Sequence, residues 1–228
     1  MTTAAALRTI RWTALGLIGL ILLGTVMVLE LGPRSQPRVV ADNAMPGTMA
    51  VAGASVGGPF NLIDHKGRAV TDAAYRGRWM LVFFGYSDCP DECPVTLQKM
   101  ANALNSLGPL ADRIAPLFIT VDPARDTPDR LARYLANFGS RIIGLTGNSE
   151  RIAAAAKAYR VYYSPAQHEQ SGIDLVSHST FLYLMNSSGK LDALFRPDIS
   201  ADQLAAALRA AFHHKKQTAR RAEERDAP

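Results

Sequence analysis

Residues 79–94 read WMLVFFGYSDCPDECP, an unbroken apolar run followed closely by two cysteines, each with a proline after it. The run from Trp79 to Gly85 has the length and composition of a central strand that is buried on both faces. Pro94 suits the first turn of a helix, so we expect a regular helix from about Pro94 to about Leu107. The stretch therefore predicts a strand, a distorted turn that holds both cysteines, and a helix.

Strand and helix patterns alternate on both sides of this stretch. The further expected strands are a hairpin over 60–70 that turns at Lys66-Gly67, a buried strand over 115–121, a short strand over 142–147 and a hairpin over 180–196. The further expected helices are one after Thr127-Pro128 capped by Asp126 or Thr127, one from a Ser149 cap through Tyr159, and one from a Ser200 cap to about Phe212. The order is that of a thioredoxin-like α/β domain with an insertion. In such open sheets, function gathers at the carboxyl ends of the strands.

The N-terminal segment Trp12–Leu31 is apolar apart from Glu30, and a membrane-spanning helix needs about 20 such residues. We expect an uncleaved transmembrane anchor rather than a cleaved signal peptide, whose apolar region is shorter. The balance of arginines on its two sides weakly favours a cytoplasmic N-terminus. The predicted organisation is an anchor over 1–31, a linker over 32–56, a thioredoxin-like domain over 57–212 and a charged, disordered tail over 213–228.

The net charge of +5 lies mostly in the two ends of the chain. Residues 57–212 carry 16 Lys and Arg against 15 Asp and Glu. A nucleic-acid-binding domain carries its positive charge on the folded surface. We therefore expect no nucleic-acid partner.

The chain has only two cysteines, Cys89 and Cys93, which excludes a scaffold of several disulfides. Their spacing can bring the sulfurs together, either to share a metal or to form a disulfide. The start of a helix favours thiolates, whereas Asp88, Asp91 and Glu92 oppose them. A purely apolar role in the core is less favoured, because the prolines place the pair at a strand-to-helix turn. Soft thiolates joined by an imidazole suit copper better than zinc, which needs four protein ligands in a structural site.

Among the histidines, His178 is the candidate third ligand. It precedes the predicted strand over 180–186, in the loop that packs beside the cysteine turn in a thioredoxin-like domain. Oxidoreductases of that fold usually have a cis-proline there, and this chain has no proline nearby. The alternative is a histidine that only makes loop hydrogen bonds. His65 in the hairpin turn, His168 in a polar loop, and His213 and His214 at a helix end are expected to be solvated.

Taken together, these residues resemble the Sco/SenC family of copper-binding proteins involved in cytochrome c oxidase assembly. The resemblance covers residues 57–212. Its marks are Gly58-Pro59-Phe60, Phe84-Gly85-Tyr86, the turn CPDECP at 89–94, VDPARDTP at 121–128, and His178-Ser179. Relatives usually have aspartate where this chain has Ser177, and often an aromatic residue where it has Asp174. These departures bear on copper affinity and Cu(II) geometry more than on the identity of the ligands.

The resemblance implies that Cys89, Cys93 and His178 bind copper, with Cu(I) held mainly by the thiolates. Asp91 is the residue that we expect to support the ligands, although it could equally cap the turn. The implied function is that of a membrane-anchored copper metallochaperone for the dinuclear copper site of a cytochrome c oxidase subunit. Other copper chaperones or thioredoxin-like reductants are further implied partners. The implied location is the inner (cytoplasmic) membrane, single-pass, with the domain in the periplasm, or in the intermembrane space in a mitochondrion.

Two other functions use the same cysteines. A thiol-disulfide oxidoreductase would keep the copper ligands of an oxidase subunit reduced, and it would not need His178. For this reason the sequence leaves open whether the protein is an enzyme. A peroxide-reducing enzyme of the peroxiredoxin type is the weaker alternative, because Cys89 and Cys93 lie among acids rather than beside an activating arginine.

Overall fold

The computed structural model describes residues 48–49, 56–163 and 180–225, which all belong to one compact unit, Val39–Pro228. They form an eight-stranded sheet in the order β1-β8-β7-β4-β5-β6-β2-β3. The strands are β1 (Thr48–Met49), β2 (Asn61–Asp64), β3 (Ala69–Thr71), β4 (Trp79–Gly85), β5 (Ile114–Thr120), β6 (Ile143–Thr146), β7 (Leu182–Met185) and β8 (Leu191–Phe195). The helices are α2 (Glu92–Leu107), α3 (Pro128–Leu135), α4 (Ser149–Ala158) and α5 (Ala201–Arg225), with 3-10 turns η1 (Asp72–Tyr75), η2 (Gly108–Arg113) and η3 (Ala136–Phe138).

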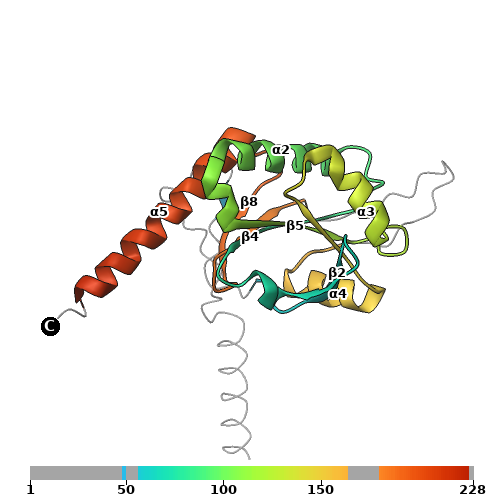
Figure 1. Ribbon diagram of the computed structural model, residues 1–228, viewed down its shortest axis with the longest axis horizontal. Helices are drawn as coiled ribbons and strands as arrows, with labels where there is room; N and C mark the ends of the chain where they lie inside the picture. The colour runs from blue at the N-terminus through green and yellow to red at the C-terminus, as the bar shows by residue number, and fades with distance from the viewer. Residues whose placement is uncertain (1–47, 50–55, 164–179, 226–228) are drawn as a thin grey trace, which may run out of the picture. The chain divides into compact units, whose positions relative to one another are not determined.

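The centre of the sheet is the strand predicted first. Every residue of β4 and of its parallel neighbour β5 is buried. Strand β7 pairs antiparallel with β4 on its other side. Figure 1 shows α2, α3 and the start of α5 on one face of the sheet and α4 on the other. Helices on both faces explain why the two central strands are continuous apolar runs rather than alternating ones, and the predicted thioredoxin-like α/β fold is confirmed in the described residues.

Helix α2 begins earlier than the sequence indicates. The prediction was a start near Pro94, whereas α2 begins at Glu92 with Asp91 at its N-cap position. Pro94 is thus the third residue of the helix. The first four backbone N–H groups of a helix have no partner within it, so a proline there removes no hydrogen bond. Cys93 consequently lies inside the first turn of α2.

Two other helix ends also differ from the sequence prediction. Helix α4 is capped by Asn148, whose side chain accepts a hydrogen bond from Arg151 N at 3.0 Å, and not by Ser149. The last helix was expected to end near Phe212 with a disordered tail after it, but α5 continues to Arg225. Residues 213–225 are rich in Lys, Arg, Glu, Gln and Ala, which all have high helix propensity. The predicted Ser200 cap of α5 is present: Gln203 N donates a hydrogen bond to Ser200 Oγ at 3.2 Å.

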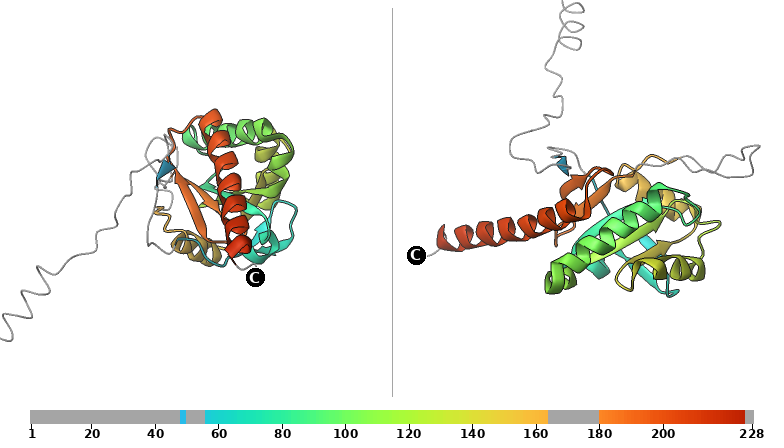
Figure 2. Two further views of the ribbon diagram at one scale, coloured as in Figure 1. Left: turned by 90° about the vertical axis from the view of Figure 1, so that its left-hand side faces the viewer. Right: turned by 90° about the horizontal axis from the view of Figure 1, so that it is seen from above.

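The packing of α5 closes the domain. Its N-terminal half lies along α2 across the face of the sheet (Figure 2). The ring of Phe212 meets that of Trp79 edge to face, at 5.2 Å between centroids.

In the part of the chain that the structure describes, no helix is long and apolar enough to cross a membrane. The predicted anchor Trp12–Leu31 lies outside these residues, and β1 falls within the stretch predicted to be a linker.

Candidate metal centre

The two cysteines meet at the carboxyl end of β4. The chain leaves this strand at Gly85, turns through residues 86–91 and enters α2. Cys93 N donates a hydrogen bond to Cys89 Sγ at 3.4 Å, and the two thiols are also hydrogen-bonded to each other. The two are not joined in a disulfide; Cys93 is completely buried and Cys89 only partly. The turn therefore presents one accessible sulfur backed by one enclosed sulfur.

The surroundings of Cys93 favour its neutral form. The hydrogen bond with Cys89 raises the pKa of the Cys93 thiol most, and burial raises this pKa further. The carboxylate of Asp126 also raises it, whereas a backbone hydrogen bond from Tyr86 lowers it. The Cys93 thiol is thus favoured mainly by the neighbouring sulfur and by burial, and not by Asp88, Asp91 or Glu92, the acids that the sequence pointed to. A metal that binds both sulfurs must displace the Cys93 proton, so its affinity should rise with pH.

Gly85 makes room for the buried sulfur. A Cβ atom at this position would lie 2.7 Å from Cys93 Sγ and 2.8 Å from Cε2 of Phe118. Both neighbours are fully buried, so neither has open space to move into. A larger residue would not fit at the end of β4, because the first turn of α2 places the Cys93 sulfur directly against the strand.

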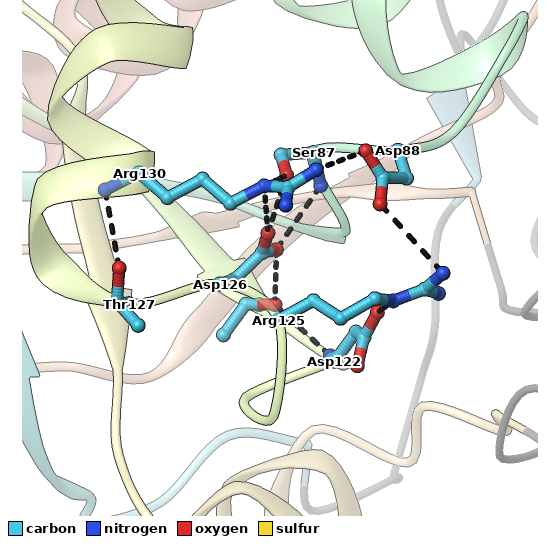
Figure 3. Close-up of polar contacts among 8 residues, drawn as sticks. Ser87, Asp88, Asp122, Arg125, Asp126, Thr127 and Arg130 are labelled. Atoms are coloured by element: carbon cyan, nitrogen blue, oxygen red, sulfur yellow. Dashed lines mark hydrogen bonds and ion pairs between the residues drawn. The ribbon is translucent and has the colours of Figure 1, made fainter.

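A buried carboxylate holds the start of the cysteine turn. Asp126, which is 1% exposed, accepts a hydrogen bond from Ser87 N at 3.0 Å and another from Ser87 Oγ. It also accepts one from Thr120 Oγ1 at 2.6 Å, at the end of β5. Figure 3 shows this carboxylate between the turn and the loop that follows β5. Burial raises the pKa of Asp126, although the hydrogen bonds from Ser87 and Thr120 oppose that shift.

Two arginines hold the turn from the solvent side. Arg130 Nε donates to Ser87 Oγ at 2.8 Å, and the same guanidinium pairs with Asp88. Arg125 Nη1 lies 3.6 Å from Asp88 Oδ2, and the same guanidinium also pairs with Asp122 (Figure 3). Helix α3 itself is capped by Thr127, which accepts a hydrogen bond from Arg130 N at 3.3 Å. Of the two caps that the sequence allowed, Thr127 is the one used, and this leaves Asp126 free to contact the turn.

The other predicted site residues have different surroundings. Asp91 is exposed at the N-cap position of α2, and its side chain makes no capping hydrogen bond. His178 and His168 lie outside the described residues. His65, which was expected to be solvated, accepts a hydrogen bond at Nδ1 from Gly144 N at 3.0 Å, so its role in the hairpin turn is structural. His213 is exposed on α5.

The donor chemistry of the turn fits a soft metal or a disulfide. Two sulfurs in mutual contact, one of them accessible, can share a thiophilic ion or join by oxidation. Within the described ranges, no group of three or more His, Cys, Asp or Glu residues is arranged to hold a metal ion.

Comparisons with known proteins point to one family. A family model described as SCO1/SenC matches residues 49–213. The mouse protein described as SCO2 homolog, mitochondrial, is 41% identical over 172 residues, which cover 73% of this chain and 68% of that protein. Protein sco1 of Schizosaccharomyces pombe is 42% identical over 156 residues, covering 67% of this chain and 59% of that protein. The matched region is thus roughly two thirds of the length of these relatives.

Solved structures agree with the sequence matches. The structure of Bradyrhizobium japonicum ScoI with copper bound has a TM-score of 0.64 and 37% identity, covering 68% of this chain and 99% of that one. Arabidopsis thaliana ScoI, also with copper bound, has a TM-score of 0.66 and 35% identity, covering 70% of this chain and 99% of that one. The described fold is therefore shared with proteins that bind copper.

Proposed function

The chain belongs to the SCO1/SenC family, and we propose that it is a membrane-anchored copper chaperone that helps to assemble the dinuclear copper site of cytochrome c oxidase. The observation that carries the proposal is the contact between Cys89 and Cys93 at the carboxyl end of β4. Support comes from relatives of the same fold whose structures contain copper. The copper is cargo, received at this turn and passed on to a client.

We propose Cys89, Cys93 and His178 as the copper ligands. Cu(I) is soft and needs little beyond two thiolates, whereas Cu(II) gains more from an imidazole nitrogen. The register of the sheet supports a contribution from the segment before β7. Leu182 at the start of β7 pairs with Phe83, two residues before Gly85 at the end of β4. Strand β7 therefore begins at the same end of the sheet as the cysteine turn. Asp91 is proposed to support the ligands from the turn itself.

The proposed setting follows from the N-terminal segment. Trp12–Leu31 would anchor the chain as a single pass in the inner (cytoplasmic) membrane, with the domain in the periplasm. The proposed client is the oxidase subunit that carries the dinuclear copper site. Other copper chaperones or thioredoxin-like reductants would load or reduce the cysteine pair.

A thiol-disulfide oxidoreductase is the second candidate, and the unequal burial of the two sulfurs favours it. Cys89 is the accessible sulfur that could attack a client disulfide, and Cys93 is the enclosed sulfur that could resolve the mixed disulfide. The raised pKa of the Cys93 thiol would slow that second step. Metal transfer and disulfide exchange use the same turn, so the experiment must separate them through His178.

The test is an anaerobic titration of the full chain in detergent with Cu(I) and Cu(II). His178→Ala should weaken Cu(II) binding by at least about 10–100-fold and alter the Cu(II) absorption spectrum, with little change for Cu(I). His213→Ala, on the exposed face of α5, is the matched control and should bind as wild type does. Oxidation of the cysteine pair should abolish binding of both ions, because the thiolate is the ligand.

The outcomes separate the two candidates. If His178→Ala binds Cu(II) as wild type does, the histidine is not a ligand. If the oxidised protein retains stoichiometric copper, the cysteine site is wrong. If His178→Ala exchanges disulfides normally yet fails to support oxidase assembly, metal handling is the function. A variant that still supports assembly would favour the oxidoreductase.

A further inference from the structure

We propose that Asp126 is a positioning residue for the cysteine pair: its buried carboxylate fixes Ser87 and thereby holds Cys89 opposite Cys93. The inference rests on the proposed function in that it concerns the same two thiols. It assigns to Asp126 a role other than capping α3, because Thr127 caps that helix.

The contacts of Asp126 lead directly to the turn. Its carboxylate is 1% exposed and receives Ser87 N at 3.0 Å, Ser87 Oγ, and Thr120 Oγ1 at 2.6 Å. A buried carboxylate is costly unless its oxygens are hydrogen-bonded, so these donors hold it firmly in place. Two of the three donor groups belong to one residue of the cysteine turn. The third, Thr120, fixes the carboxylate to the end of β5.

The connection from Ser87 to the sulfur is short. Only Asp88 lies between Ser87 and Cys89, and Cys89 N donates back to Tyr86 O at 3.3 Å. Fixing Ser87 therefore restricts the backbone that carries Cys89. Cys93 is already held in α2 and against Gly85. The position of Cys89 therefore depends on the turn before it, and Asp126 is a buried group that holds this turn.

The arginines on the solvent side hold the cysteine turn less strongly than Asp126 does. Arg130 Nε also reaches Ser87 Oγ, at 2.8 Å, and lies 3.8 Å from Asp126 Oδ1, but the Arg130 side chain is 38% exposed. Ion pairs at that exposure contribute little. Removing Asp126 would thus leave Ser87 N without its partner and the turn held by a solvated guanidinium. Ordering of the turn would fall, and with it the effective concentration of one thiol near the other.

The effective concentration of the two thiols is measurable without copper. The metal-free chain in detergent is equilibrated with mixtures of reduced and oxidised glutathione. One protein dithiol and one oxidised glutathione give one protein disulfide and two reduced glutathiones, and Cys89 and Cys93 are the only thiols of the chain. The equilibrium constant for this exchange reports how well the turn brings the sulfurs together.

Asp126→Ala should lower that equilibrium constant about tenfold, the effect expected if about one residue of the turn gains backbone freedom. Ser87→Ala, which loses the hydroxyl contact and keeps the backbone contact, should lower it less. Asp126→Asn, whose amide oxygen can still accept from Ser87 N, should restore much of the wild-type value. Thr120→Val is the matched control: it removes one hydrogen bond of the same carboxylate and keeps both bonds to Ser87, so it should lower the equilibrium constant much less than Asp126→Ala does.

The control separates positioning from general destabilisation. Thr120→Val and Asp126→Ala should both unfold more easily, but Asp126→Ala should lose much more of the thiol pairing. An unchanged equilibrium constant in Asp126→Ala, or an equal loss in Thr120→Val, overturns the inference. If Asp126→Ala does not fold, the test rests on Ser87→Ala. A wild-type equilibrium constant in Ser87→Ala would then overturn the inference. A wild-type chain that binds no copper contradicts the proposed function instead, because this exchange needs no metal.

Discussion

Replacing Gly85 with alanine should disturb the cysteine pair through the core of the protein. The added methyl would lie 2.7 Å from Cys93 Sγ and 2.8 Å from Cε2 of Phe118, well inside normal contact distance. The backbone of Gly85 does not have the positive φ that other residues avoid, so the effect is steric. Since Cys93 and Phe118 are both fully buried, the clash must be relieved by shifting the sulfur, the ring or the start of α2.

Overpacking of this kind costs about 1–3 kcal/mol. With a denaturant dependence of about 2 kcal/mol/M in urea, a loss of 2 kcal/mol lowers the unfolding midpoint by about 1 M. Displacement of the Cys93 sulfur should add a second effect that stability alone does not predict. Its hydrogen bond with Cys89 would lengthen, and the glutathione exchange equilibrium should shift away from the disulfide.

The assay combines urea unfolding of the reduced protein, followed by circular dichroism, with the glutathione equilibrium. Gly144→Ala is the matched control, because its added methyl would lie 2.6 Å from Cδ1 of Leu135, in a contact between β6 and α3 that does not involve the cysteines. It should lower stability and leave the thiol equilibrium unchanged. The reasoning fails if Gly85→Ala unfolds and pairs its thiols as wild type does, or if Gly144→Ala shifts the thiol equilibrium equally.

Three further variants test other contacts. Burial opposes ionisation of Asp64, but hydrogen bonds from Arg68 and Lys66, together with the charge of Arg68, outweigh it and lower the pKa of Asp64 below 3.8. Its contribution to stability is thus present above about pH 3.8 and lost as the pH falls through the lowered pKa, so Asp64→Asn should flatten the acid limb of a stability–pH curve. The Tyr134 hydroxyl is buried without a hydrogen-bond partner among the described residues, so Tyr134→Phe should raise the unfolding free energy by about 1 kcal/mol in urea titrations. Arg130→Ala should cost at most about 1 kcal/mol, and it should shift the glutathione equilibrium less than Asp126→Ala does; a larger shift would assign the positioning role to Arg130.

Much of the fold could be predicted from the sequence because its signals are local. The apolar run of β4 shows a strand buried on both faces, and a central parallel sheet needs such strands. The hairpin between β2 and β3 turns where Lys66-Gly67 predicts, with Gly67 at φ +78°. The caps at Thr127 and Ser200 are side chains that bond to the backbone three residues later. The same locality explains why the starts of α2 and α4 differ from the prediction by only one or two residues, whereas α5 runs to Arg225, well past the predicted end near Phe212.

The candidate site divides in the same way. The sequence alone determined that Cys89 and Cys93 share a turn, since four positions along a chain limit how far apart they can lie. Only the tertiary structure decided that Cys93 is the enclosed sulfur, that its pKa is raised, and that Gly85 and Asp126 serve the turn. Asp126 lies 39 positions from Ser87, and its sequence context indicated a helix cap. The two meet because β4 and β5 are parallel neighbours, so the residues that follow their carboxyl ends lie together, and such a long-range contact leaves no periodic pattern in the chain.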